Sequence, residues 1–227
     1  MKALAISGAL VAGALSVSAA QAADQEYNVF AIPSQEIVDL VADTAERMGE
    51  YDLETFYARG YVPHATLYLT SFRESDLPTV KAKIEEMASG MSSFPLEIKG
   101  THLTGGRWFF LDIAPNVKLQ ALSDEFVTQL MDLRNPDYEI PSWAANIPAK
   151  AASFERYGSP NVFSQYNPHL TQLASEESPR LDDFIATLSE GEPAVIGRVV
   201  GVGFAPVNPL GQAKQGDETV FFFPDAK

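Results

Sequence analysis

The sequence predicts an α+β fold with mainly antiparallel sheets. Strand-like and helix-like segments alternate irregularly, a Gly105-Gly106 turn suited to positive φ joins two strand-like segments as a hairpin, and no run of regular βαβ units occurs. Because no shift in composition marks a linker, we expect one domain. Strand and helix groups recur on either side of Gly105-Gly106, which suggests two similar lobes within that domain.

The first elements follow from local patterns. Residues 27–33 read as a strand that ends at a proline, and Ser34 is placed to cap a helix that stops near Gly49. Along residues 63–70, polar or aromatic side chains alternate with apolar ones, which predicts a strand. The side chains expected on one side of this strand are those of His64, Thr66, Tyr68 and Thr70.

The same periodicities predict the remaining elements. The predicted helices cover residues 76–88, 119–133 and 181–188, and the predicted strands cover 95–104, 107–113, 166–174, 195–204 and 220–223. Four prolines interrupt every pattern between residues 134 and 164. A connection of that length predicts a functional loop or an insertion.

The N-terminus has the pattern of a secretory signal. Lys2 precedes a short apolar run over residues 3–17, and Ala20-Gln21-Ala22 has the small-x-small form of a cleavage site. We therefore expect residues 1–22 to be a signal peptide and residues 23–227 to be the mature domain, periplasmic or secreted. An uncleaved membrane anchor is the alternative, but the run is shorter and less apolar than the roughly 20 residues that a span requires.

Composition excludes several functions. With no cysteine, thiol catalysis, iron–sulfur clusters and disulfide frameworks are ruled out. The formal net charge of −14 opposes binding to long nucleic acids, because phosphate neutralisation by Lys and Arg dominates that affinity. A small anionic ligand in a locally basic pocket stays compatible with this charge, and Arg107, Lys150 and Arg156 are candidates for such a pocket.

Each of the three histidines stands two residues before a threonine, in His64-Ala65-Thr66, His102-Leu103-Thr104 and His169-Leu170-Thr171. The chain has 11 threonines in 227 residues, so one such coincidence is expected about once in twenty cases. Pro63 and Pro168 precede the first and third histidines, which gives P-H-x-T twice. In a strand, residues i and i+2 lie on one side about 6.5 to 7 Å apart, so each motif presents an imidazole and a hydroxyl together.

Two such strands side by side would place two imidazoles around one phosphorus atom. One neutral imidazole could take a proton from water or a ribose hydroxyl, and the other, as imidazolium, could protonate the leaving oxygen. Histidine suits both tasks because its ordinary pKa is near 6.5. No metal is needed for this chemistry, and no H-E-x-x-H pattern is present.

The paired P-H-x-T motifs, about a hundred residues apart, resemble those of the 2H phosphoesterase superfamily, which includes 2′,3′-cyclic phosphodiesterases and 2′-5′ RNA ligase-like proteins. The resemblance also covers Phe30-Ala31-Ile32-Pro33 and the hairpin. It implies two pseudo-symmetric lobes with mainly antiparallel sheets around a central cleft and helices on the outside. It further implies that His64 and His169 are catalytic and that Thr66 and Thr171 bind the phosphate.

His102 departs from the family pattern, and we expect it to be a structural or rim residue rather than a substrate contact. The leading hypothesis is a metal-independent phosphoesterase that cleaves a cyclic or 2′-5′-linked phosphodiester of a nucleotide or short oligonucleotide without a cofactor, with ligation also compatible. Two alternatives remain: a 2H-like protein that binds a phosphorylated small ligand without turning it over, and a three-histidine metallohydrolase. The sequence identifies no protein partner.

Overall fold

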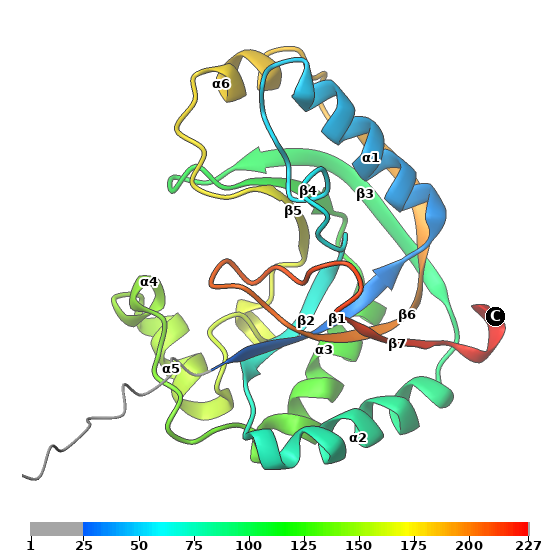
Figure 1. Ribbon diagram of the computed structural model, residues 1–227, viewed down its shortest axis with the longest axis vertical. Helices are drawn as coiled ribbons and strands as arrows, with labels where there is room; N and C mark the ends of the chain where they lie inside the picture. The colour runs from blue at the N-terminus through cyan, green and yellow to red at the C-terminus, as the bar shows by residue number, and fades with distance from the viewer. Residues whose placement is uncertain (1–24, 227) are drawn as a thin grey trace, which may run out of the picture.

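The computed structural model describes residues 25–226 as a seven-stranded antiparallel sheet with helices on its outside (Figure 1). The strand order is β2-β1-β6-β3-β4-β5, and β7 also pairs with β6. The expected signal peptide, residues 1–22, lies outside the described residues. Within residues 25–226, no helix combines the length and the apolar character that crossing a membrane would require.

The bounds of the elements agree with the sequence pattern to within about three residues except in one region. The strands are β1 (Glu26–Pro33), β2 (Ala65–Ser71), β3 (Phe94–Leu103), β4 (Phe109–Ile113), β5 (His169–Leu173), β6 (Ala194–Pro206) and β7 (Thr219–Phe222). The helices are α1 (Gln35–Gly49), α2 (Leu77–Ser89), α3 (Val117–Leu130), α4 (Ser142–Ala145), α5 (Pro148–Tyr157) and α6 (Arg180–Ile185).

The region that differs is the connection over residues 134–164, which was expected to be an irregular loop. It contains α4 and α5, and α5 begins at Pro148. A proline at the first helical position lacks only an N–H that would have no partner there, so it starts a helix instead of breaking one. Gly158 then ends α5 in the left-handed conformation with φ +72°.

The hairpin between β3 and β4 is present, but its turn differs from the expectation. Neither Gly105 nor Gly106 has a positive φ; Arg107, at φ 58°, takes the left-handed conformation. Its guanidinium donates to the carbonyl oxygens of Glu176 and Ser178 and forms an ion pair with Asp182. These contacts hold the arginine in a conformation that non-glycine residues rarely adopt.

The long strand β6 joins two lobes, one with β1, β2 and β7 and the other with β3, β4 and β5. Its first half pairs with β3, and its second half pairs with β1 and β7. The sheet is therefore continuous and strongly curved, as Figure 1 shows, and its two end strands, β2 and β5, contact each other. This curvature brings together the strands that carry the two P-H-x-T motifs.

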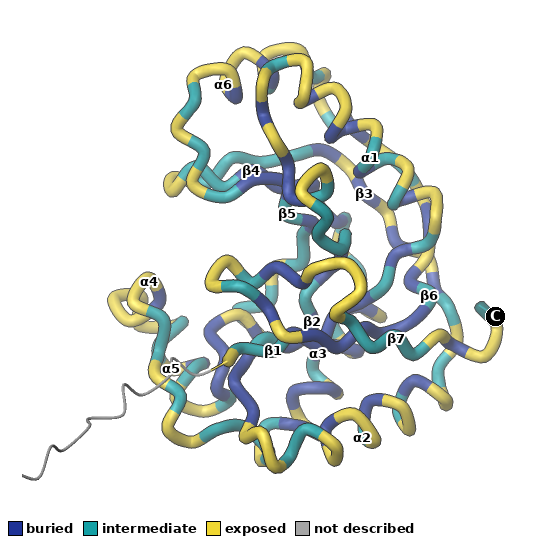
Figure 2. The backbone as a smooth tube through the Cα atoms, viewed as in Figure 1, coloured by how far each residue is buried: buried dark blue, intermediate teal, exposed yellow. Residues whose placement is uncertain are grey.

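The main core lies between the sheet and the helices. Helix α1 packs on β6 and β1, α3 packs on β2, and α2 packs on β7 and β6. Figure 2 shows the inner sides of these helices and the middle of the strands as buried, and the outer sides of the helices as exposed. A smaller cluster packs α6 against β4 and β5 through Phe184, Phe109 and Leu173.

Strand β2 contains an irregularity that changes which side chains share a side. Val29 of β1 pairs with Tyr68, whereas the next residue, Phe30, pairs with Thr66. Leu67 is thus the extra residue of a β-bulge. As a result, Tyr68 and Thr70 do not share a side with His64 and Thr66 as the simple alternation predicted: their hydroxyls donate to the carbonyl oxygens of Tyr157 and Gly158 in the α5 region.

Candidate active site

Both motif histidines are held in the same way. Nδ1 of His64 lies 2.8 Å from the carbonyl oxygen of Val62, and Nδ1 of His169 lies 2.8 Å from that of Asn167. In each case the carbonyl belongs to the residue before the motif proline, which proline restricts to extended conformations. Since a carbonyl oxygen only accepts, Nδ1 of each neutral ring carries the proton, and Nε2 is the nitrogen left for proton exchange.

The surroundings of the two motifs are also equivalent. Phe30 pairs across the strands with Thr66, and Phe110 pairs with Thr171. Each phenylalanine contacts the histidine of its own motif, with ring centroids 4.8 Å apart for Phe30 and His64 and 3.8 Å apart for Phe110 and His169. The two lobes therefore present the same unit of histidine, threonine and phenylalanine, which explains the repeated motif in the sequence.

A hydrogen bond joins the segments that carry the two motifs. The hydroxyl of Tyr166, three residues before His169, donates to the carbonyl oxygen of Thr66 at 3.0 Å. The motif residues are also close enough to interact electrostatically, since a positive charge on His64 lowers the pKa of His169. The structure thus brings together the two segments that carry the motifs.

Burial depresses the proton affinity of both imidazoles. The pKa of His169 is lowered to about 4, first by burial and further by charges on His102 and His64. The pKa of His64 is also lowered by burial, and its bond to the Val62 carbonyl offsets part of that effect. Both rings are therefore neutral near pH 7, the state in which Nε2 can act as a base.

Asn28 is a site residue that sequence reasoning missed. Its fully buried side chain donates from Nδ2 to Thr66 Oγ1 at 2.9 Å, and the same nitrogen lies 3.2 Å from His64 Nε2. Oδ1 of Asn28 is buried without a hydrogen-bond partner among the described residues. The signal that could have revealed it is an asparagine in an apolar strand, between Tyr27 and Val29, because buried amides normally have a reason to be there.

His102, which we expected to be a structural or rim residue, lies beside His169. It pairs across the strands with Phe110, and its ring packs edge-on to Phe110 and perpendicular to His169, with the two imidazole centroids 6.4 Å apart. Nδ1 of His102 bonds to the carboxylate of Asp112, which itself pairs with His169 across the strands. The structure therefore places a third imidazole and a carboxylate on the side of the sheet that carries His169.

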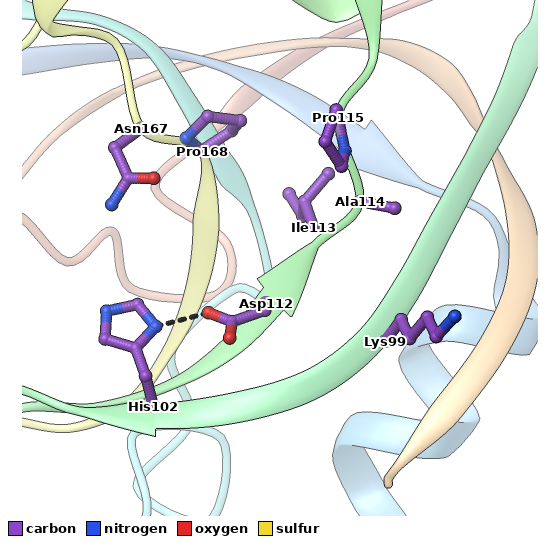
Figure 3. A pocket seen from close by; sticks show the side chains of 8 residues that line it. All are labelled: Lys99, His102, Asp112, Ile113, Ala114, Pro115, Asn167 and Pro168. Carbon is purple, nitrogen blue, oxygen red and sulfur yellow. Dashed lines mark hydrogen bonds and ion pairs between the residues drawn. The ribbon is translucent and has the colours of Figure 1, made fainter. Parts of the chain in front are cut away.

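A pocket of about 470 Å³ adjoins this group (Figure 3). Its lining residues are Lys99, His102, Asp112, Ile113, Ala114, Pro115, Asn167 and Pro168. Asn167 and Pro168 immediately precede His169, so the pocket continues the site on the β3–β4 side.

The basic residues proposed from the sequence are engaged elsewhere. Arg107 binds Asp182 and backbone carbonyls near α6. Lys150 bonds to Asn161 and to the carbonyl oxygen of Gln165, and Arg156 lies over the ring of Tyr157. Within residues 25–226, no group of three or more His, Asp or Glu side chains is arranged to hold a metal ion.

Comparison with known proteins identifies the family of this chain. A model of the 2′-5′ RNA ligase superfamily matches residues 39–204, a range that includes both motifs. The chain belongs to this superfamily. Membership confirms the resemblance to the 2H phosphoesterases and supports an enzyme of the phosphoesterase type.

Solved structures show how far the likeness extends. The crystal structure of TT0787 of Thermus thermophilus has a TM-score of 0.51 at 14% identity, over 88% of this chain and 99% of that one. E. coli LigT complexed with 3′-AMP has a TM-score of 0.47 at 13% identity, over 88% of this chain and 95% of that one. The first of these matches shows that the fold is shared. No curated protein matches the sequence significantly.

Proposed function

We propose that this protein is an exported, metal-independent phosphoesterase that acts on a 2′,3′-cyclic or 2′-5′-linked phosphodiester of a nucleotide or short oligonucleotide. The observation that carries the proposal is the pair of identically held imidazoles, each with Nδ1 on the carbonyl before a proline, on strands that meet. Membership in the 2′-5′ RNA ligase superfamily supports the same chemistry.

The reaction uses the two Nε2 atoms in complementary roles. One of His64 and His169, neutral, takes the proton of a water or ribose hydroxyl while its oxygen forms a bond to phosphorus. The bond from phosphorus to the leaving oxygen breaks, and that oxygen receives a proton from the other imidazole. Thr66 and Thr171 donate hydrogen bonds to the non-bridging oxygens, where negative charge develops.

Substrate binding favours the uptake of a solvent proton by one imidazole, which gives the imidazolium that this scheme needs. Both imidazoles are neutral near pH 7 in the free protein because burial lowers their pKa values. A phosphodiester anion between them stabilises the protonated form of an adjacent imidazole, because an opposite charge favours the charged state. The anion therefore raises the pKa of the histidine that donates the proton.

One observation favours a second candidate, a protein that binds a phosphorylated small ligand without turning it over. Nδ2 of Asn28 lies 3.2 Å from Nε2 of His64, so the nitrogen expected to exchange a proton already has a hydrogen-bond partner. In the phosphoesterase, Asn28 must release Nε2 or reorient when substrate enters. In the binding protein, it would stay in place.

A product assay separates these candidates. Purified protein is incubated between pH 6 and pH 8, without added metal and with EDTA, with a panel of 2′,3′-cyclic nucleotides and 2′-5′-linked dinucleotides. The phosphoesterase converts at least one of them in the presence of EDTA. Saturable binding without product would support the binding protein, and activity abolished by EDTA and restored by Zn²⁺ would support a metallohydrolase.

Export has its own test. The full chain is produced in a bacterial host, and the N-terminus of the protein recovered from the periplasm is sequenced. Export with cleavage after Ala22 gives a chain that begins at Ala23. Recovery of the uncleaved chain in the membrane fraction would support the anchor instead.

A further inference from the structure

The pair formed by His102 and Asp112 breaks the equivalence of the two lobes. Phe110 has His102 as its neighbour on β3, whereas its counterpart Phe30 has Gly203 as its neighbour on β6. Two residues after Phe110 stands Asp112, whereas two residues after Phe30 stands Ile32. The second lobe thus carries a polar pair where the first has a glycine and an apolar side chain.

The pair is oriented and accessible. The Asp112 carboxylate holds Nδ1 of His102, so Nε2 lies on the opposite edge of the ring, away from Asp112 (Figure 3). The side chains of His102 and Asp112 remain 37% and 36% exposed, and both line the pocket beside His169. His102 is therefore accessible to a ligand in the pocket that Asn167 and Pro168, the two residues before His169, also line.

The separation of the rings suits one phosphate group. The centroids of His102 and His169 are 6.4 Å apart with perpendicular planes. Hydrogen bonds from ring nitrogens to oxygen span about 2.7 to 3.2 Å, so two nitrogens on rings at this spacing can contact different oxygens of one phosphate. Phe110 lies against both rings and holds them in this arrangement.

The site also needs positive charge. The side chains of Arg107, Lys150 and Arg156 are engaged elsewhere, and the threonine hydroxyls are neutral. Lys99 lines the far side of the pocket (Figure 3). The Asp112 carboxylate bound to Nδ1 fixes the orientation of the His102 ring, as in the histidine–aspartate pairs of hydrolases, so its Nε2 edge is left to meet a ligand.

We propose that His102, oriented by Asp112, is a third substrate-contacting histidine, and that its Nε2–H binds a non-bridging oxygen of the substrate phosphate. His102 exchanges no proton in this step; it holds the phosphate by a hydrogen bond while His64 and His169 perform the proton transfers. This inference rests on the proposed function for the identity of the ligand, a phosphoester anion. It extends the site beyond the two P-H-x-T motifs.

Imidazole NMR tests the contact directly, because the chain has only three histidines. Inorganic phosphate is titrated into the ¹⁵N-labelled protein, and the signals are assigned with single histidine variants. The expected result is that saturating phosphate shifts the ring signals of all three histidines with one common dissociation constant. Shifts confined to His64 and His169 would overturn the role of His102 and leave the proposed function in place.

A response from none of the three rings would instead count against the proposed function, and the inference would fall with it.

Phosphate affinity is also compared among variants. Replacement His102→Gln removes the imidazole and its bond to Asp112 but keeps a hydrogen-bond donor, and we expect about tenfold weaker phosphate binding, the effect of one charge-assisted hydrogen bond to the anion. Unchanged affinity in this variant would contradict the contact.

Lys118→Gln serves as the matched control. It removes one cationic side chain from an exposed position on α3. This variant should leave phosphate affinity within about twofold of the wild type. With a substrate found in the product assay, His102→Gln should raise KM about tenfold while kcat changes less, as expected for binding shared by ground and transition states. Equal loss of kcat and kcat/KM would show that His102 performs a different task.

Discussion

The imidazole of His169 lies nearly flat against the ring of Phe110, with centroids 3.8 Å apart and planes inclined by 24°. In the other lobe, the rings of His64 and Phe30 are 4.8 Å apart and inclined by 49°. The stacked Phe110 ring covers one face of His169, and the tilted Phe30 ring covers part of His64. Because the charged ring loses more from removal of water than the neutral ring, these contacts help to explain why burial lowers both pKa values.

Replacing Phe110 by leucine should therefore raise the pKa of His169. The smaller side chain uncovers one face of the ring, so the pKa moves from about 4 toward the ordinary value near 6.5. An NMR titration of the His169 ring measures this change. Trp108→Leu is the control, since Trp108 contacts Phe110 rather than His169. An unaltered His169 pKa in Phe110→Leu would show that the stack is not a cause of the shift.

The same pKa makes stability depend on pH. His169 titrates at about 4 in the folded protein and near 6.5 when unfolded, so between these values the unfolded chain binds more protons. The free energy of unfolding must then fall as pH is lowered through this range, by up to about 1.4 kcal/mol per pH unit for one histidine. Urea denaturation of the wild type and His169→Gln at pH 7 and pH 4.5 should show a smaller loss in the variant. Equal losses would contradict the lowered pKa.

Alanine at either motif histidine should remove at least about a hundred-fold of kcat, the usual contribution of a positioned acid or base. The double variant His64→Ala/His169→Ala should be little worse than either single variant, because the two imidazoles act as a unit. Initial rates on a substrate from the product assay provide the measurement. If the two effects multiplied, independent roles for the two rings would follow.

Asn28→Leu tests whether the amide positions Thr66. Leucine has a similar size but cannot donate to Thr66 Oγ1. We expect kcat to fall about tenfold, equivalent to the loss of one hydrogen bond of about 1.4 kcal/mol. The melting temperature should change little, because the variant also removes the buried, unpartnered Oδ1. A fully active variant would rule out positioning by Asn28.

Gly203→Ala should destabilise the fold beside the first motif, where Gly203 of β6 pairs with Phe30 of β1. A Cβ atom there would lie 2.3 Å from Phe30 Cε2, so the ring that contacts His64 must move. Overpacking of this kind costs about 1 to 3 kcal/mol in the free energy of unfolding, which thermal denaturation can detect. Gly105→Ala is the control, because a Cβ there would meet nothing within 4 Å. Equal melting temperatures for the two variants would contradict the packing argument.

Local patterns in the sequence were sufficient for most of the fold and for the paired motif. Apolar periodicity located the strands and the long helices because burial of one side imposes period 2 or 3.6 on the side chains. The spacing of His64 and Thr66, and of His169 and Thr171, predicted two imidazole–hydroxyl pairs. Helix α5 was missed because a starting proline was interpreted as an interruption.

Only the tertiary structure decided which other side chains join the motifs. Asn28 reaches His64 and Thr66 because β1 pairs with β2 in one particular register, and a bulge at Leu67 sets which residues of β2 share a side. His102 and Asp112 stand beside His169 because β4 lies between β3 and β5. Strand order, register and bulges arise from contacts between segments distant in the chain, and the period of a single strand carries no information about its neighbours.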